Sequence, residues 1–261
     1  MDKNKITFNP EFLREGTAIE DFFQPDRIVI GGNDPEKLLV LRELYKDFDA
    51  ELIETDPISS QLIKYLANTY LPLRLSFVNE AARLIDYSNG NQEDVLKGVG
   101  LDSRIGSHYF RPSPAWGGSC FPKDLIEVNN FYKEGEVTLP LISNIIESND
   151  IQTKWTVDKL TSILSNENIK SVLLIGAAFK EDTDDLRNSP TLDIYKMLLQ
   201  KDVNTNIYDE MVELAEYNSV DNLDDISDKT LVVLMYPIKK ALMEKIETIL
   251  TETNSILYTP W

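Results

Sequence analysis

Between Pro57 and Tyr87, apolar side chains recur at intervals of three and four residues, as Leu62, Leu66, Tyr70, Leu73, Phe77, Ala81 and Leu84. This spacing predicts one long amphipathic helix, because it places the side chains along a single stripe. Further apolar residues widen the stripe, namely Ile63, Ala67, Val78 and Ile85. A stripe of this width is enough to pack against a partner helix as well as the core. Pro72 interrupts the helix and is expected to kink it.

The residues before this helix have a short α/β pattern. Residues 9–23 begin like a helix, with Asn9 as the N-cap and Pro10 in the first turn. Residues 27–31 form an apolar run typical of a buried strand, and Asp34 and Pro35 open a helix that extends to about residue 47. We therefore interpret residues 1–55 as the remnant of an N-terminal α/β domain.

The remaining chain divides into a helical part and a parallel-sheet part. Helices are expected at residues 93–99, 124–133 and 139–164, with a loop rich in Gly, Ser and Pro at 102–121. From residue 166 onward, apolar runs alternate with helical segments, the first of which opens at Ser189 and Pro190; the runs are 171–177, 203–208, 230–235 and 255–258. This alternation predicts a Rossmann-like parallel sheet. The expected fold class is α/β, with a helical central domain at 56–165 and a C-terminal α/β domain at 166–261.

Composition excludes several kinds of partner. The chain has 44 acidic and 26 basic residues and a net charge of −18, so neither nucleic acid nor an anionic membrane is expected to bind it. The single cysteine, Cys120, excludes an internal disulfide, and the single histidine, His108, argues against a metal site. Apolar runs are far shorter than a membrane span, and the first residues lack the apolar core of a signal peptide. We expect a cytoplasmic protein without metal.

The loop WGGSCFPKD, residues 116–124, is the most informative stretch. Gly117 and Gly118 allow another group to approach the backbone closely. Pro122 suits the first turn of the following helix, so Cys120 is expected at a helix N-terminus, where the thiolate form is favoured. Asp124 follows four residues later, on the same side. The alternative is a buried structural cysteine that caps the helix.

Two polar pairs lie at helical spacing. Lys64 and Asn68 share a face of the long helix and, if they face inward, are able to stabilise a developing oxyanion. Glu11 and Glu15 repeat the spacing near the start of the chain. Solvated polar side chains are the alternative interpretation of both pairs.

A third pair lies in the loop of residues 178–190. Lys180 and Arg187 follow the first strand of the C-terminal sheet, where doubly wound sheets bind ligands, and are expected to neutralise phosphate. A solvated acidic loop is the alternative. The chain contains no G-x-G-x-x-G sequence, so a dinucleotide cradle is not expected.

Six sequence blocks, in this order, resemble the UDP-glucose/GDP-mannose dehydrogenase family. They are NPEFLREG (9–16), PDRIVIG (25–31), KYLANTYLPLRLSFVNE (64–80), RIG (104–106), GGSCFPKD (117–124) and AFKEDTDDLRNSP (178–190). Members of this family oxidise C6 of a nucleotide sugar twice and use two molecules of NAD. The resemblance therefore implies NAD as cofactor, a UDP-sugar as substrate and a homodimer built on the long helix.

The resemblance also implies chemical roles for the matched residues. Cys120 corresponds to the nucleophile, which captures the aldehyde as a thiohemiacetal that is oxidised to a thioester and then hydrolysed. Lys64 and Asn68 match the residues that hold the C6 oxygen. Asp124 and Glu15 match carboxylates associated with water and proton transfer.

Other matched residues are expected to bind the ligands. Glu11, Tyr109, Gly117 and Lys180 correspond to substrate-binding positions. Arg104 matches an arginine that reaches the sugar nucleotide across the dimer interface. Arg187 matches an arginine that contacts the cofactor.

The departures from the family define the alternatives. Family members begin with a G-x-G-Y-x-G domain, of which this sequence retains only a final strand and helix, and a threonine of that domain that takes part in the chemistry is absent. We therefore expect a fragment or a reduced form that is inactive alone and binds NAD weakly. RIG resembles the UDP-glucose branch, which predicts conversion of UDP-glucose to UDP-glucuronate. YFRP (109–112) also resembles the GDP-mannose branch, so a GDP-mannose 6-dehydrogenase portion is one alternative. A non-catalytic nucleotide-sugar-binding and dimerisation module is the other.

Overall fold

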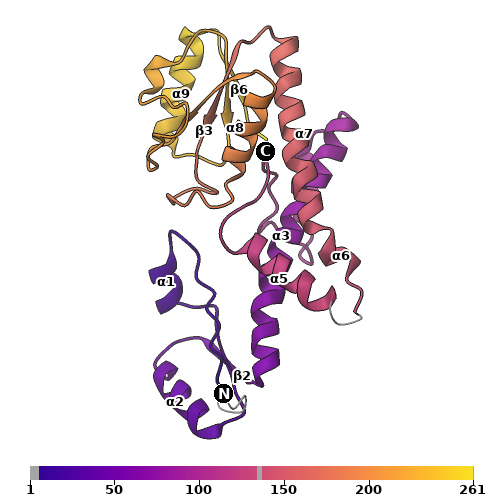
Figure 1. The fold of residues 1–261 in the computed structure, drawn as a ribbon, viewed down its shortest axis with the longest axis vertical. Coiled ribbons are helices and arrows are strands. Elements are labelled where there is room, and N and C mark those ends of the chain that lie inside the picture. Colours follow the sequence, from indigo (N-terminus) through magenta and orange to yellow (C-terminus); the bar gives the residue numbers. More distant parts are fainter. Residues whose placement is uncertain (1–5, 134–136, 261) are drawn as a thin grey trace. The chain divides into compact units, whose positions relative to one another are not determined.

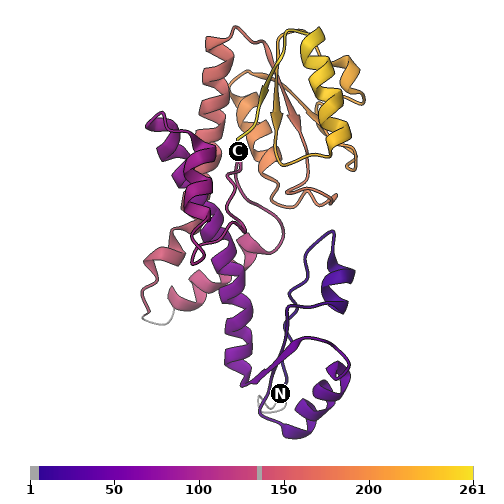
Figure 2. The ribbon, with the colours of Figure 1, turned by 180° about the vertical axis from the view of Figure 1, so that it is seen from behind.

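A computed structural model describes residues 6–133 and 137–260 (Figures 1 and 2). The chain divides into two compact units, Met1–Tyr70 and Leu71–Trp261. Helix α3 (Pro57–Tyr87) begins in the first unit and ends in the second. No helix in the described ranges is long and apolar enough to cross a membrane.

The first unit is built on two parallel strands. β1 (Arg27–Gly31) pairs with β2 (Glu51–Thr55), and α2 (Pro35–Tyr45) connects them. β1 and α2 agree with the sequence, and Asp34 caps α2 as expected by accepting a hydrogen bond from the amide of Glu36. The prediction of a single strand was wrong. β2 carries three acidic or polar side chains among its five residues and is largely exposed, so it lacks the apolar run that reveals a buried strand.

The predicted start of a helix at Asn9 is also wrong, since the only helix in this segment is α1 (Ala18–Phe23). The side-chain amide of Asn9 donates to the carbonyl of Val29 at 2.9 Å, and its oxygen accepts from the hydroxyl of Tyr45 at 2.6 Å. The backbone of Phe8 pairs with that of Gly31 at 2.7 Å in both directions. These bonds hold the segment against β1 in an extended form, and no N-cap is made.

Helix α3 has the bounds that the apolar spacing predicted and continues through Pro72 without ending. The carboxylate of Asp56 accepts the amides of Ile58 and Ser59 at its start. Val78 and Ile85 are buried in the core. The opposite side of the stripe is exposed in this chain, at Leu66, Tyr70, Phe77 and Leu84.

Beyond α3, the second unit begins with helices α4 (Gln92–Gly100), α5 (Phe121–Lys133), α6 (Pro140–Ser143) and α7 (Ile145–Asn166). The single helix predicted for residues 139–164 is therefore divided. At the division, the side chain of Asn144 donates to the carbonyl of Pro140 at 2.6 Å, which ends α6.

A four-stranded parallel sheet follows, in the order β4-β3-β5-β6. Its strands are β3 (Ser171–Ile175), β4 (Asn204–Tyr208), β5 (Thr230–Leu234) and β6 (Ile256–Tyr258). Apolar residues of α7 and of α8 (Pro190–Gln200) cover one face, and α9 (Lys240–Glu252) covers the other (Figure 1). The sheet confirms the α/β fold class. Between β4 and β5, where a helix was expected, there is only a 3-10 turn, η2 (Leu223–Asp225).

Candidate functional site

In the first unit, the structure brings Glu11 and Lys64 together. The ammonium group of Lys64 donates to the backbone carbonyl of Glu11 at 2.6 Å and to its carboxylate at 2.9 Å. It also lies 5.4 Å from the centre of the Phe12 ring, over which Arg27 stacks at 3.8 Å. The side chain of Lys64 is 18% exposed, so this ion pair is partly shielded from water. Lys64 is thus held toward the NPEFLREG segment.

Asn68 lies one turn along α3 from Lys64 and is buried. Glu15 lies at the other end of the NPEFLREG segment and is half-buried. Arg14 fastens this segment to α1, because its guanidinium and backbone amide both donate to the carboxylate of Asp21. The hydrogen bonds from Arg14 lower the pKa of Asp21 to about 2.

In the second unit, the loop that carries Cys120 is fixed by side chains from two helices. The amide of Trp116 donates to the side-chain oxygen of Asn149 at 3.0 Å, and the side-chain nitrogen of Asn149 donates back to the carbonyl of Trp116 at 2.9 Å. The indole nitrogen of Trp116 donates to the hydroxyl of Ser76 at 2.9 Å. Trp116 is buried, so these bonds satisfy groups that water does not reach freely.

The residues just before Trp116 are held in the same way. Asn79 accepts the amide of Ser113 at 2.9 Å, Gln152 donates to the carbonyl of Ser113 at 2.9 Å, and Thr156 donates to the carbonyl of Pro114 at 2.8 Å. Sequence reasoning missed these residues. The sequence signal that could have found them is the presence of single polar residues among the apolar positions of α3 and α7.

Cys120 directly precedes α5, as predicted, and its side chain is exposed. The amide of Asp124 donates to the carbonyl of Cys120 at 3.0 Å, so the cysteine begins the first turn. The alternative of a buried structural cysteine was wrong for this chain. Asp124 is 3% exposed and forms an ion pair with Lys123.

The two glycines of this loop pack against the loop between β3 and α8. A side chain on Gly117 would meet the carbonyl oxygen of Asn188 at 1.9 Å, and one on Gly118 would meet the ring of Phe179 at 2.8 Å. The side chain of Asn188 donates to the carbonyl of Gly118 at 3.1 Å. The close approach predicted for the glycine pair is therefore to another part of the same unit.

The predicted phosphate-binding residues flank these contacts. Lys180 follows Phe179 and is half-buried, with its ammonium group 5.8 Å from the centre of the Phe179 ring. Arg187 precedes Asn188 and donates twice to the carboxylate of Asp185, at 2.9 and 2.8 Å. Both cations therefore lie in the β3–α8 loop, which packs against the loop of residues 116–124, called the cysteine loop below.

Arg104 and Tyr109 lie in the loop that precedes the cysteine loop. Arg104 is strongly exposed and donates to the carboxylate of Asp102 at 2.6 Å. Tyr109 is exposed and has a left-handed backbone, with φ of 52°. Arg74 of α3 anchors this loop by donating to the carbonyls of Ile105 and Gly106.

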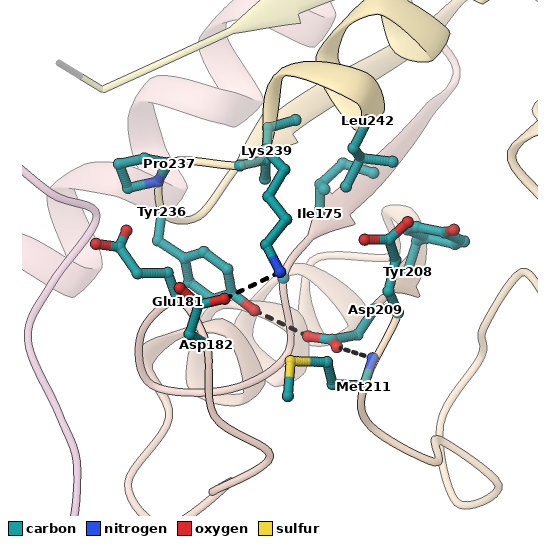
Figure 3. Close-up of a pocket in the computed structure, with 13 residues that line it drawn as sticks. Ile175, Glu181, Asp182, Tyr208, Asp209, Met211, Tyr236, Pro237, Lys239 and Leu242 are labelled. Atoms are coloured by element: carbon teal, nitrogen blue, oxygen red, sulfur yellow. Dashed lines mark hydrogen bonds and ion pairs between the residues drawn. The ribbon is translucent and has the colours of Figure 1, made fainter. Parts of the chain in front are cut away.

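A cavity of about 260 Å³ lies at the carboxyl ends of β3, β4 and β5 (Figure 3). Asp209 connects the strand ends: it accepts the amide of Ala177 at 2.7 Å, the amide of Met211 at 2.8 Å and the hydroxyl of Tyr236 at 2.9 Å. Burial and the Asp209 carboxylate raise the pKa of Tyr236 well above its ordinary value. The ring of Tyr236 fills the space beside Gly176, where a side chain would meet it at 2.5 Å.

The charge of this cavity does not suit a phosphate. Its lining carries several carboxylates, those of Glu181, Asp182, Asp209 and Glu210. The one lysine in the lining, Lys239, pairs with Asp182 at 3.2 Å. Neither Lys180 nor Arg187 is among the lining residues, so the predicted phosphate ligands do not belong to this cavity.

At the start of α2, the carboxylate of Asp34 accepts the amide of Glu36 at 3.1 Å, which is an ordinary N-cap hydrogen bond. A side chain on Gly31 would meet the hydroxyl oxygen of Ser60 at 2.0 Å, so Ser60 already covers the turn. Across residues 6–133 and 137–260, no three His, Cys, Asp or Glu side chains gather as metal ligands.

Three family models match consecutive parts of the chain. Residues 2–49 match the NAD binding domain of the UDP-glucose/GDP-mannose dehydrogenase family, residues 58–151 match its central domain, and residues 173–253 match its UDP binding domain. The cofactor of the matched N-terminal domain is NAD by this description.

Comparison with individual proteins finds members of the same family. UDP-glucose 6-dehydrogenase of Rickettsia felis is 41% identical over 218 residues, which cover 82% of this chain and 49% of that protein. UDP-glucose 6-dehydrogenase TuaD of Bacillus subtilis is 33% identical over 95% of this chain and 56% of its own length. A solved UDP-glucose dehydrogenase from Pyrobaculum islandicum is 34% identical with a TM-score of 0.80, covering 88% of this chain and 55% of that one. The chain spans about half the length of the curated relatives it matches.

Proposed function

The chain belongs to the UDP-glucose/GDP-mannose dehydrogenase family, and on this premise we propose that it is the substrate-binding and cysteine-bearing portion of a nucleotide-sugar 6-dehydrogenase. The proposed reaction of the whole enzyme converts UDP-glucose to UDP-glucuronate. The observation that carries this proposal is the exposed Cys120 at the start of α5, in a loop packed against residues of the UDP-binding domain.

Cys120 is the proposed nucleophile. Its thiolate attacks C6 of the aldehyde, a carbon–sulfur bond forms, and the carbonyl electrons move to oxygen to give a thiohemiacetal. The start of α5 supports this role, because the unpaired amides of a helix N-terminus favour the thiolate. In the final step, water attacks the thioester carbon, the carbon–sulfur bond breaks, and the proton of the water passes to a nearby carboxylate.

Asp124 is the proposed acceptor of that proton. It lies one turn from Cys120, is buried, and forms an ion pair with Lys123. Glu15 is proposed to assist the movement of protons on the side of the NPEFLREG segment. These roles follow from matched positions in the family.

Lys64 and Asn68 are proposed to hold the C6 oxygen. A cation and an amide in a partly shielded position stabilise negative charge on that oxygen more strongly than they do in water. The ion pair between Lys64 and Glu11 supports this role, because it already directs the ammonium group toward the predicted substrate-binding segment.

The sugar nucleotide is proposed to bind with contributions from Glu11, Tyr109, Gly117 and Lys180. Arg104 is proposed to act on the site of a second copy of the chain in a homodimer built on α3. Arg104 is suited to this because its side chain is 87% exposed.

Hydride removal from C6 is the chemistry that NAD supplies in this family when bound. Arg187 is the proposed cofactor contact. Since the sequence contains no G-x-G-x-x-G, the proposal for this chain is limited to substrate binding, thiol addition and thioester hydrolysis.

The sequence contains no G-x-G-x-x-G, and this favours a second candidate function, a non-catalytic module that binds a nucleotide sugar and dimerises. The two candidates differ in Cys120: a catalytic portion needs a reactive thiol next to bound UDP-glucose, and a binding module does not.

Calorimetric titration with UDP-glucose and with GDP-mannose tests the substrate. We expect UDP-glucose to bind more tightly, and tighter binding of GDP-mannose would assign the chain to that branch.

Lys180→Ala should weaken UDP-glucose binding about tenfold, since a hydrogen bond to a charged group contributes about 1.5 kcal/mol or more. Lys196→Ala, an exposed lysine on α8, is the matched control and should leave the affinity unchanged. Absence of binding to both nucleotide sugars would reject the proposed function.

A further inference from the structure

Asn188 joins two loops that carry predicted site residues. Its side-chain nitrogen donates to the carbonyl of Gly118 at 3.1 Å. Its own carbonyl oxygen lies so close to Gly117 that any side chain there would overlap it. One residue of the β3–α8 loop therefore touches both glycines of the cysteine loop, through its side chain and its backbone.

The backbone of Asn188 is left-handed, with φ of 51°. Asparagine tolerates this conformation better than most residues. The residues after it are fixed to the end of β3: Ser189 donates to the carbonyl of Ala177 at 2.6 Å, and Thr191 donates to that of Gly176 at 2.7 Å. The base of the β3–α8 loop is thus closed directly behind Asn188.

The cysteine loop is fixed in the same way on its other side, where Asn149 binds both backbone groups of Trp116. Gly117 and Gly118 lie between this fixed residue and Cys120. Because glycines have few conformational restrictions, their position depends on what packs against them. Asn188 and Phe179 are the neighbours that do so.

We infer that Asn188 is a positioning residue that couples the two loops, so that a nucleotide sugar held by the β3–α8 loop also orders the backbone next to Cys120. The inference rests on the proposed function. It assigns Asn188 no contact with the reacting atoms. The side-chain amide of Asn188 sets the position of Gly118. Its backbone carbonyl oxygen leaves no room for a side chain at position 117, so glycine is required there.

The test uses the full chain and three variants. Asn188→Asp keeps the size and tolerates the left-handed backbone, but it places a carboxylate against the carbonyl of Gly118. Asn188→Gly keeps the backbone freedom and removes the side-chain donor. Asn168→Asp is the matched control, because Asn168 also has a φ of 51° and is exposed in the turn that follows α7.

The first measurement is amide hydrogen exchange without ligand. Exchange at residues 117–119 should rise about three- to tenfold in Asn188→Asp, the range expected for the loss of one hydrogen bond, and less in Asn188→Gly. Exchange in β3 and β5, and the melting temperature, should change little. Unchanged exchange at residues 117–119 would overturn the inference whether or not a ligand binds.

The second measurement adds saturating UDP-glucose and follows alkylation of Cys120. In wild type and Asn168→Asp, the ligand should slow alkylation, and in Asn188→Asp this protection should fall by a similar three- to tenfold factor with little change in UDP-glucose affinity. Equal protection in wild type and Asn188→Asp would overturn the inference and leave the proposed function standing. Failure of wild type to bind UDP-glucose would reject the proposed function, and the exchange measurement would still decide whether Asn188 joins the loops.

Discussion

Asn149 makes two opposed hydrogen bonds to the backbone of Trp116, accepting its amide at 3.0 Å and donating to its carbonyl at 2.9 Å. One side chain of α7 thereby replaces the pairing that a neighbouring strand would provide. Trp116 lies four residues before Cys120, so this contact sets the point from which the cysteine loop departs.

Replacement of Asn149 should destabilise the chain. In Asn149→Leu, both backbone groups of buried Trp116 lose their partner, and the expected loss is about 1–3 kcal/mol in the free energy of unfolding. Asn149→Asp keeps the acceptor for the amide of Trp116 but places a carboxylate against its carbonyl, so it should also destabilise the chain. Lys154→Ala, an exposed position on the same helix, is the control. Urea unfolding of the three variants measures the difference, and equal stability of Asn149→Leu and wild type would contradict this account.

The exposed side of α3 predicts a dimer. Phe77 is 57% exposed, and Leu66, Tyr70 and Leu84 are exposed along the same stripe. Light scattering should give about twice the 29.8 kDa of one chain. Phe77→Glu should shift the protein toward monomer, because a carboxylate would be buried in the interface. Ile126→Glu on α5 changes an apolar side chain that is also exposed and should leave the mass unchanged. A wild-type monomer would remove the interface and the proposed role of Arg104.

The chain alone should not reduce NAD. Hydride transfer requires the nicotinamide to be held close to C6, and the sequence contains no G-x-G-x-x-G that would bind the pyrophosphate of NAD. An absorbance assay for NADH, with UDP-glucose and NAD in excess, should give no signal above background. Sustained turnover would show that NAD binds by contacts other than a helix N-terminus.

Cys120 should react quickly with iodoacetamide near neutral pH. We expect it to be labelled faster than a model thiol, because it is exposed at the start of α5, and UDP-glucose should slow the labelling. Lys64→Ala should reduce the rate, as the roles proposed for the two residues require. Lys196→Ala serves as the control for loss of a positive charge. A cysteine that reacts only after denaturation would contradict the proposed nucleophile.

The NPEFLREG segment should loosen in acid. The pKa of Asp21 is about 2 in the folded chain, because Arg14 donates to its carboxylate, against 3.8 in the unfolded chain. A lowered pKa means that the contribution of Asp21 to stability is fully present above about pH 4 and is lost as the pH falls toward 2. NMR titration of the carboxyl carbon measures this directly. Asp21→Asn should show the loosened segment already at neutral pH, and an Asp21 pKa near 3.8 would contradict the contact with Arg14.

The sequence predicted elements whose signal is local and periodic. The spacing of Leu62, Leu66 and Tyr70 was enough for the bounds of α3, and the apolar runs were enough for the four strands of the second sheet. The segment around Asn9 was predicted wrongly because its conformation depends on Val29 and Tyr45, which are distant in sequence. β2 was missed because its exposed, acidic residues resemble a loop.

The same distinction applies to the candidate site. Lys64 and Glu11 were selected on separate grounds, and the structure brings them together across 53 positions. The residues that position the cysteine loop could not be predicted from the sequence. Asn149 and Asn188 are single polar residues without a motif, and their importance comes from the backbone groups that fold against them.

Tyr236 has a consequence for how the second sheet meets a ligand. In open α/β sheets, ligands bind in the crevice outside the carboxyl ends of the strands. Here the hydroxyl of Tyr236 donates to Asp209 (Figure 3). The phenol ring takes the space beside Gly176, and Asp209 also accepts the amide of Ala177. A side chain of the protein itself thus occupies that position. The strand ends are therefore already joined by side chains of the chain itself, and the proposed binding of a nucleotide sugar should change the loops that follow the strands more than it changes the sheet.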